Sequence, residues 1–114
     1  MEDEDPANVI NTNFLGCFYV AKYLTPLRVA TSNTSSSKAY IAISSISSSQ
    51  LTGSAFVSTT YNVSKAAVNR LVEHIQNDHA KDGVLAYAVN PGSVLTSQVK
   101  GLSEAETAKR SRCK

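Results

Sequence analysis

Long hydrophobic runs are missing from the sequence, and so is the leader that a secreted protein carries. No stretch approaches the roughly 18–20 uninterrupted apolar residues that a membrane-spanning helix needs. The first five residues, Met1 to Asp5, include four acids, whereas a secretory signal starts with positive charge and continues with an apolar run. We therefore expect a soluble, cytoplasmic protein without a membrane partner.

Cysteine and net charge are also low. Cys17 falls in an apolar helical pattern and Cys113 in a polar stretch, both without metal-ligand neighbours, so we expect reduced thiols and no metal site. The formal net charge of +2 is spread along the chain, which argues against nucleic acid as a partner. The short basic run at 109–112 leaves a nucleic-acid contact or a nuclear address as a minor alternative.

The length of 114 residues, 42% of them hydrophobic, suits one small domain, 1–114, of which 100–114 is a polar tail. Asp5 and Pro6 suit a helix start, and apolar residues at three- and four-residue spacing predict a buried stripe that continues to about Pro26. The stripe consists of Val9, Ile10, Phe14, Cys17, Phe18, Ala21 and Leu24. A polar loop is expected at 31–37, and a capping-box pattern begins at Ser103.

Two short apolar runs, 39–43 and 84–89, predict strands buried on both faces of a parallel sheet. Between them we expect a Ser- and Thr-rich loop at 45–60 and a second helix at 61–79, whose broad apolar stripe needs partners on more than one side. Asp82-Gly83 predicts the end of that helix. The order helix, strand, helix, strand predicts an α/β fold with helices on the faces of the sheet.

One pair of side chains in the second helix suggests acid–base chemistry. Tyr61 and Lys65 are four residues apart, so both project from the same face of a helix. A free tyrosine has a pKa near ~10, and a neighbouring cation favours the phenolate and lowers that pKa. The pair lies between two strand ends, and open α/β sheets bind ligands at the carboxyl ends of their strands.

Four segments, in the same order, resemble motifs of short-chain dehydrogenases/reductases. They are Asn13-Phe14-Leu15-Gly16, Ile43-Ser44-Ser45, Tyr61-Asn62-Val63-Ser64-Lys65 and Asn90-Pro91-Gly92-Ser93-Val94-Leu95-Thr96. The resemblance implies a partial Rossmann-like, doubly wound parallel sheet. It also implies an oxidoreductase that uses NAD or NADP, with no preference readable, to move hydride between nicotinamide and a carbonyl or alcohol substrate.

The resemblance implies a role for each matched polar residue. Tyr61 would be the proton donor in carbonyl reduction and the acceptor in alcohol oxidation, and Lys65 would lower the pKa of Tyr61 and hold the nicotinamide ribose. Asn13 would connect Lys65 to a water relay. A serine would stabilise charge on the substrate oxygen. Its position after the strand favours Ser45, whereas the family's usual spacing before the tyrosine favours Ser48, and we choose Ser45.

The last motif would lie against the nicotinamide. The implied cofactor-binding residues are therefore Tyr61, Lys65, Pro91, Gly92, Val94 and Thr96.

The family's N-terminal βαβ half, with its GxxxGxG turn at the pyrophosphate, is not found here, because the five glycines are too scattered to form such a turn. Two hypotheses remain. The chain is part of an oxidoreductase, or it is a truncated, non-catalytic remnant that acts as an interaction or dimerisation module. The family's two long helices usually form the dimer interface, so the resemblance also implies a possible homo-oligomer.

Overall fold

The computed structural model describes residues 5–31, 37–49, 58–92 and 94. Its elements, in chain order, are α1 (Pro6–Ile10), the π-helical segment η1 (Asn11–Leu15), α2 (Gly16–Ala30), β1 (Lys38–Ile43), the 3-10 turn η2 (Ile46–Ser48), α3 (Thr59–His79), the 3-10 turn η3 (Ala80–Asp82) and β2 (Val84–Val89). β1 and β2 pair in parallel, from Lys38 opposite Val84 to Ile43 opposite Val89. The predicted α/β class with a parallel sheet is confirmed.

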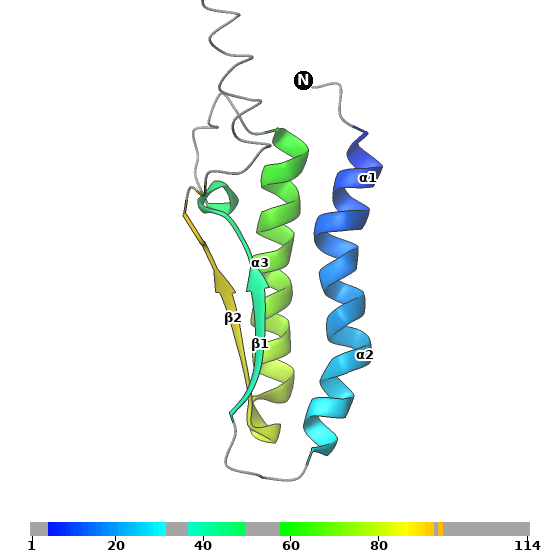
Figure 1. Ribbon diagram of the computed structural model, residues 1–114, viewed down its shortest axis with the longest axis vertical. Coiled ribbons are helices and arrows are strands. Elements are labelled where there is room, and N and C mark those ends of the chain that lie inside the picture. Colours follow the sequence, from blue (N-terminus) through cyan, green and yellow to red (C-terminus); the bar gives the residue numbers. More distant parts are fainter. Residues whose placement is uncertain (1–4, 32–36, 50–57, 93, 95–114) are drawn as a thin grey trace, which may run out of the picture.

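Two layers make up the described structure: the two strands, and a pair of helices on one face of them, namely α3 and the first helix, formed by α1, η1 and α2 (Figure 1). α2 contacts α3 and β1, and α3 packs against both strands and against the first helix. Its buried residues are Ser64, Val68, Val72 and Ile75, and Val68 has no exposed surface at all. The expectation that this helix needs partners on more than one side is therefore confirmed.

The first helix begins as predicted and extends beyond its buried stripe. The Asp5 carboxylate accepts a hydrogen bond of 3.1 Å from the Ala7 N–H, and Pro6 opens the helix. The buried stripe was predicted to continue to about Pro26, and the last buried residue of α2 is Thr25, although the helix itself runs through this proline to Ala30. A proline forfeits one helical hydrogen bond, and buried Thr25 holds this part of the helix against its neighbours.

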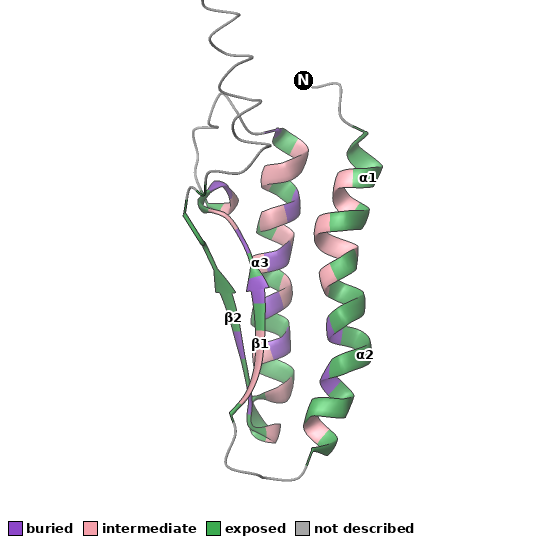
Figure 2. Ribbon diagram, viewed as in Figure 1, coloured by how far each residue is buried: buried purple, intermediate pink, exposed green. Residues whose placement is uncertain are grey.

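The predicted burial of the first helix is too broad. Ala21 is buried and Cys17 packs against the core, but Phe18 and Leu24 are 39% and 52% exposed. Only a narrow strip of α2 meets α3 and β1. Figure 2 shows this helix as largely exposed, in contrast to the buried positions that follow one another along α3.

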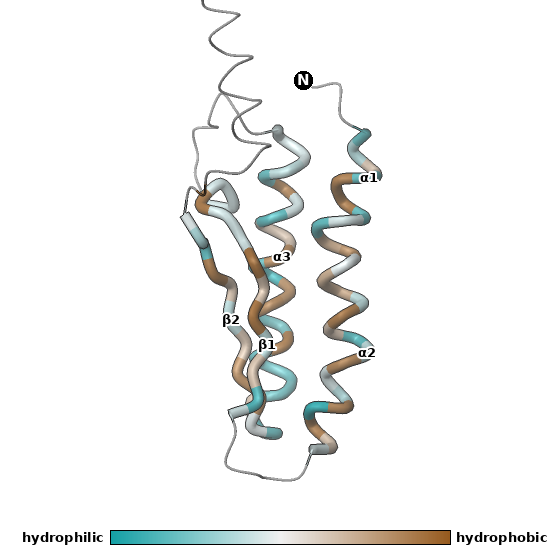
Figure 3. The backbone as a smooth tube through the Cα atoms, viewed as in Figure 1, coloured by the Kyte–Doolittle hydropathy of each residue, from teal (hydrophilic) through white to brown (hydrophobic). Residues whose placement is uncertain are grey.

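The strands are buried on one face, so the prediction of two buried faces is wrong for the described residues. Ala42, Val84 and Ala86 belong to the buried face, with α3 packed against the strands. The other face exposes Ile41, Ile43, Leu85, Tyr87 and Val89. Figure 3 shows the apolar character of both strands, which is greater than a one-sided sheet of this size requires.

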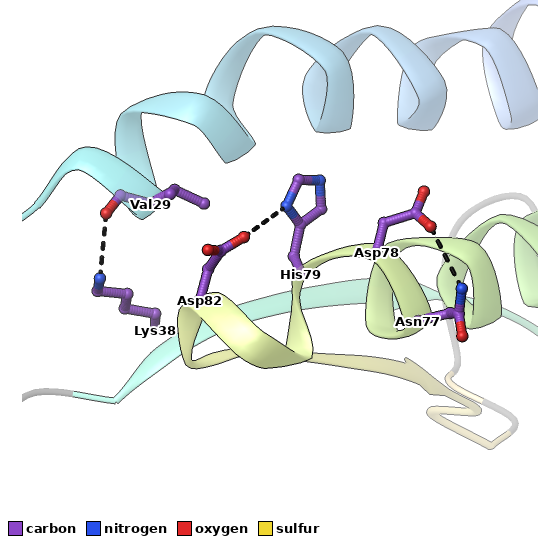
Figure 4. A network of polar contacts seen from close by, with 6 residues as sticks. All are labelled: Val29, Lys38, Asn77, Asp78, His79 and Asp82. Carbon is purple, nitrogen blue, oxygen red and sulfur yellow. Dashed lines mark hydrogen bonds and ion pairs between the residues drawn. The ribbon is translucent and has the colours of Figure 1, made fainter.

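Polar contacts close the end of the molecule at which α2 and α3 stop (Figure 4). The Lys38 ammonium donates to the Val29 carbonyl in the last turn of α2 at 3.3 Å, where free carbonyls favour a cation. His79 and Asp82 approach each other to 3.3 Å. Gly83 then adopts a left-handed φ of 76°, which confirms the helix stop predicted at Asp82-Gly83.

No helix in the described ranges has the length and apolar character that crossing a membrane would require. The predicted polar tail at 100–114, the capping box at Ser103 and Cys113 lie outside the described residues, as does most of the loop predicted at 31–37.

Tyr40 connects β1 to α2, and its surroundings give the fold a pH dependence. Its hydroxyl donates to the Cys17 carbonyl at 2.9 Å. Burial, reinforced by the neighbouring Cys17, raises the pKa of Tyr40 from 10.0 to about 12. In the unfolded chain the Tyr40 phenol ionises near pH 10.0. Between that pH and about 12, the folded chain therefore keeps a proton that the unfolded chain has lost.

We therefore expect the free energy of unfolding to fall as pH rises from 10.0 to about 12, in part because of Tyr40. Tyr40→Phe removes this ionisation, so its stability falls less steeply across the same window. Urea unfolding at several pH values measures the difference, with Tyr87→Phe on the exposed sheet face as the matched control. Parallel pH curves for Tyr40→Phe and the unmodified chain would contradict the assignment.

Candidate active site

The start of α3 fixes the position of Tyr61. Buried Ser58 caps the helix, and its hydroxyl accepts a hydrogen bond of 2.9 Å from the Tyr61 N–H. The helix thus begins at Thr59, two residues before the predicted start, and Tyr61 lies in its first turn. This cap hydrogen bond fixes the Tyr61 backbone at the start of α3.

Lys65 links this helix to the end of β1. Its ammonium nitrogen lies 5.6 Å from the centre of the Tyr61 ring. The same nitrogen donates to the Ile43 carbonyl, the last residue of β1, at 2.9 Å. The predicted pair is therefore brought together, with its positive charge at the carboxyl end of a parallel strand.

The ends of the two strands leave the sheet next to each other. Ile43 is opposite Val89, and the Ser44 N–H extends the ladder by donating to the Val89 carbonyl at 2.8 Å. Ser45 and Asn90 therefore follow at the same edge. The segments after β1 and after β2 therefore both start at the strand ends where Lys65 binds the Ile43 carbonyl.

The segment after β2 turns sharply. The Asn90 side-chain oxygen accepts from the Gly92 N–H at 3.1 Å, and Gly92 has a φ of 75°, a conformation that glycine adopts without strain. Pro91, Gly92 and Val94 are exposed. Thr96, the remaining residue predicted to contact the cofactor, lies outside the described residues.

The two candidate serines lie in one turn but make different bonds. The Ser45 hydroxyl accepts from the Ser47 N–H at 3.2 Å and caps η2. The Ser48 hydroxyl donates to the Ser45 carbonyl at 2.7 Å. Among the described residues, no hydrogen bond joins either serine to Tyr61 or Lys65.

Asn13 lies in the π-helical segment η1, a deviation from the α-helix that often marks functional sites. Its amide donates to the Ser64 hydroxyl at 3.1 Å, and Ser64 donates to the Tyr61 carbonyl at 2.7 Å. Ser64 is completely buried. Asn13 thus supports the backbone of Tyr61, while its connection to Lys65 through water stays a prediction.

Asn69 was missed by the sequence reasoning. Its side chain accepts from the Ser44 hydroxyl at 2.5 Å and donates to the Ser48 hydroxyl at 2.7 Å. The available signal was its spacing, because Asn69 follows Lys65 by four residues and so shares a helix face with it. An isolated asparagine on a helix is otherwise typical of a solvated surface.

Known proteins with similar sequences carry related names. A profile of the short chain dehydrogenase family matches residues 1–107. The short chain dehydrogenase pgmD of Aspergillus terreus is 35% identical over 92 residues, which are 81% of this chain and 28% of that protein. An uncharacterized oxidoreductase of Staphylococcus aureus is 36% identical over 90 residues, 79% of this chain and 36% of the relative.

A solved structure shares the fold. The Pseudomonas aeruginosa RhlG/NADP active-site complex superposes with a TM-score of 0.75 at 18% identity, over 87% of this chain and 39% of that one. The chain spans about a third of the length of these proteins. The family profile matches residues 1–107 of the 114 in this chain. We conclude that the chain belongs to the short chain dehydrogenase family.

Proposed function

We propose that this chain carries the acid–base residues of an NAD(P)-dependent oxidoreductase that interconverts carbonyl and alcohol substrates. The observation that carries the proposal is the Lys65 ammonium, which lies beside the Tyr61 ring and binds the carbonyl at the end of β1. This arrangement places a phenol and a cation at the edge of the sheet at which α/β proteins bind ligands.

Tyr61 moves the proton in this reaction. During reduction its hydroxyl donates a proton to the substrate oxygen, and during oxidation the phenolate takes a proton from the alcohol. A nicotinamide nucleotide held at this edge would supply or accept the hydride at the substrate carbon. Lys65 places positive charge beside the phenol, and the Ser45 hydroxyl donates to the oxygen that gains negative charge.

The residues at the edge fit a nicotinamide nucleotide. Lys65 offers donors suited to ribose hydroxyl groups, the Tyr61 ring lies beside it, and Val94 offers an exposed apolar side chain for the flat nicotinamide ring. Gly92 borders open space, with no described atom within 4 Å of where its Cβ would lie. The RhlG structure is described as an NADP complex, which supports the same cofactor class here, as either NAD or NADP.

The alternative, a non-catalytic interaction module, has weaker support. It accounts for the exposed apolar surface but not for the contact of Lys65 with both Tyr61 and the end of β1. The names of the relatives also favour an oxidoreductase.

A homo-oligomer is a separate part of the proposal. α2 exposes Phe18, Tyr19, Tyr23, Leu24 and Leu27, and the rings of Tyr19 and Tyr23 stack at 6.3 Å. Apolar side chains gathered on one helix are typical of an interface. We propose that a second copy of this helix covers them.

In an active form of the protein that contains this chain, we expect Tyr61→Phe to abolish turnover while cofactor affinity stays nearly unchanged. The substitution removes the hydroxyl that transfers the proton and keeps the ring beside Lys65. Steady-state rates and nucleotide titration measure the two effects separately, with Tyr87→Phe as the control. A Tyr61→Phe variant that keeps most of its rate would remove the central assignment.

The 114-residue chain on its own should bind NADH or NADPH very weakly. Its motifs supply nicotinamide and ribose contacts, whereas the glycine-rich turn that holds the pyrophosphate is not among them. Titration followed by nucleotide fluorescence measures the affinity. Tight binding by this chain would show that other residues hold the pyrophosphate.

We expect Tyr23→Glu to shift the oligomer toward monomer in sedimentation velocity, because a carboxylate in an apolar interface must be desolvated. Tyr87→Glu, on the exposed face of the sheet, is the matched control and should leave the assembly unchanged. A sedimentation profile that responds to Tyr87→Glu and not to Tyr23→Glu would place the interface on the sheet instead.

A further inference from the structure

Three polar residues follow one line along α3. Tyr61, Lys65 and Asn69 are spaced by four residues, which places them on one face of the helix. Lys65 binds the carbonyl of Ile43 at the end of β1. Asn69, one turn further on, binds the side chains of Ser44, which precedes Ser45, and of Ser48, three residues after it.

The hydrogen bonds of Asn69 have a defined direction. The Ser48 hydroxyl gives its single proton to the Ser45 carbonyl, which can only accept. Ser48 must therefore accept from the amide nitrogen of Asn69, and the amide oxygen then faces the Ser44 hydroxyl, which donates to it. Each of the three polar side chains has one arrangement that satisfies all of these bonds.

This direction separates the two candidate serines. The proton of Ser48 is committed to the Ser45 carbonyl, so Ser48 has none to give to a substrate oxygen. The Ser45 hydroxyl oxygen accepts a hydrogen bond from the Ser47 N–H. Among the described residues, no hydrogen bond uses the proton of this hydroxyl. Of the two candidates, Ser45 is therefore the one whose hydroxyl can donate.

Burial makes the network specific. Ser44 is 6% exposed, and Ser48 and Asn69 are half-buried; shielded hydrogen bonds are stronger than exposed ones and costly to leave unmade. The turn η2 therefore depends on its bond to α3 through Asn69, as well as on its own backbone bonds from Ser48 to Ser45 and from Ser49 to Ile46.

We propose that Asn69 is a positioning residue for Ser45. It fixes Ser48 as a structural brace against the Ser45 backbone and keeps the Ser45 hydroxyl free to donate to the substrate oxygen. The inference rests on the proposed oxidoreductase function for its catalytic consequence. The hydrogen-bond network itself can be tested without activity.

The first test measures amide hydrogen exchange by NMR in the 114-residue chain. Asn69→Ala should speed exchange at Ser48 and Ser49 about five- to tenfold, as expected for the loss of roughly one net hydrogen bond that holds the turn. The Val72 amide in the core of α3 should not change. Asn77→Ala is the matched control, because the side chain of this exposed asparagine on the same helix bonds, among the described residues, only to Asp78, at 3.3 Å.

Asn69→Asp separates the two halves of the network. The carboxylate keeps the size of the side chain and still accepts from Ser44, but it has no proton for Ser48. We expect it to exchange as fast as Asn69→Ala at Ser48 and Ser49. Unchanged exchange in both variants would overturn the proposed brace.

The second test uses rates in an active form that contains this chain. Ser45→Ala should lower kcat by about a hundredfold or more, as for the loss of one donor to a developing oxyanion. Asn69→Asp and Ser48→Ala should each lower kcat several-fold without changing the KM for the nucleotide, and their double variant should lose no more than either alone.

The outcomes separate this inference from the proposed function. A collapse of kcat in Ser48→Ala equal to that in Ser45→Ala would make Ser48 the donor and overturn the assignment. Multiplicative losses in the double variant would show that Asn69 does not act through Ser48. Complete absence of oxidoreductase activity would count against the proposed function, and hydrogen exchange would still decide whether Asn69 holds the turn.

Discussion

The bond between the Lys65 ammonium and the Ile43 carbonyl is the contact on which the rest of the site depends. It joins the first turns of α3 to the carboxyl end of β1, two segments that are 22 residues apart in the sequence. A lysine on a solvated helix would instead leave its ammonium in water. By extending to the strand, Lys65 keeps positive charge at the sheet edge and keeps the Tyr61 ring beside it.

α3 performs two tasks because its faces differ. Successive residues of an α-helix are about 100° apart, so Ser64 and Val68 point into the core while Lys65 and Asn69, one residue later, approach the strand end and the serine turn. The buried residues Ser64 and Val68 set the distance between α3 and the sheet. The polar residues Lys65 and Asn69 bind the end of β1 and the serine turn. A substitution at either buried residue would therefore disturb the site without touching it.

The sequence was sufficient for the elements but not for their packing. Asp5-Pro6, Asp82-Gly83 and the two apolar runs have local causes, and the structure confirms what they predict. Phe18 and Leu24 were expected in the core because periodicity identifies an apolar face without saying what covers it. The burial of the strand residues Ile41 and Leu85 was overestimated for the same reason, since helices cover only one face of the described sheet.

The site shows the same division at finer scale. Spacing alone pairs Tyr61 with Lys65, because both lie on one helix, whereas the contact of Asn69 with Ser44 and Ser48 depends on a turn that folds back from another part of the chain. Asparagine has low helix propensity because its side chain competes for backbone bonds. Asn69 lies in the middle of α3, and its side chain is instead committed to two serines of the turn. Bonds outside the helix must offset that cost, so an asparagine with two such bonds is held there by tertiary structure and not by local preference.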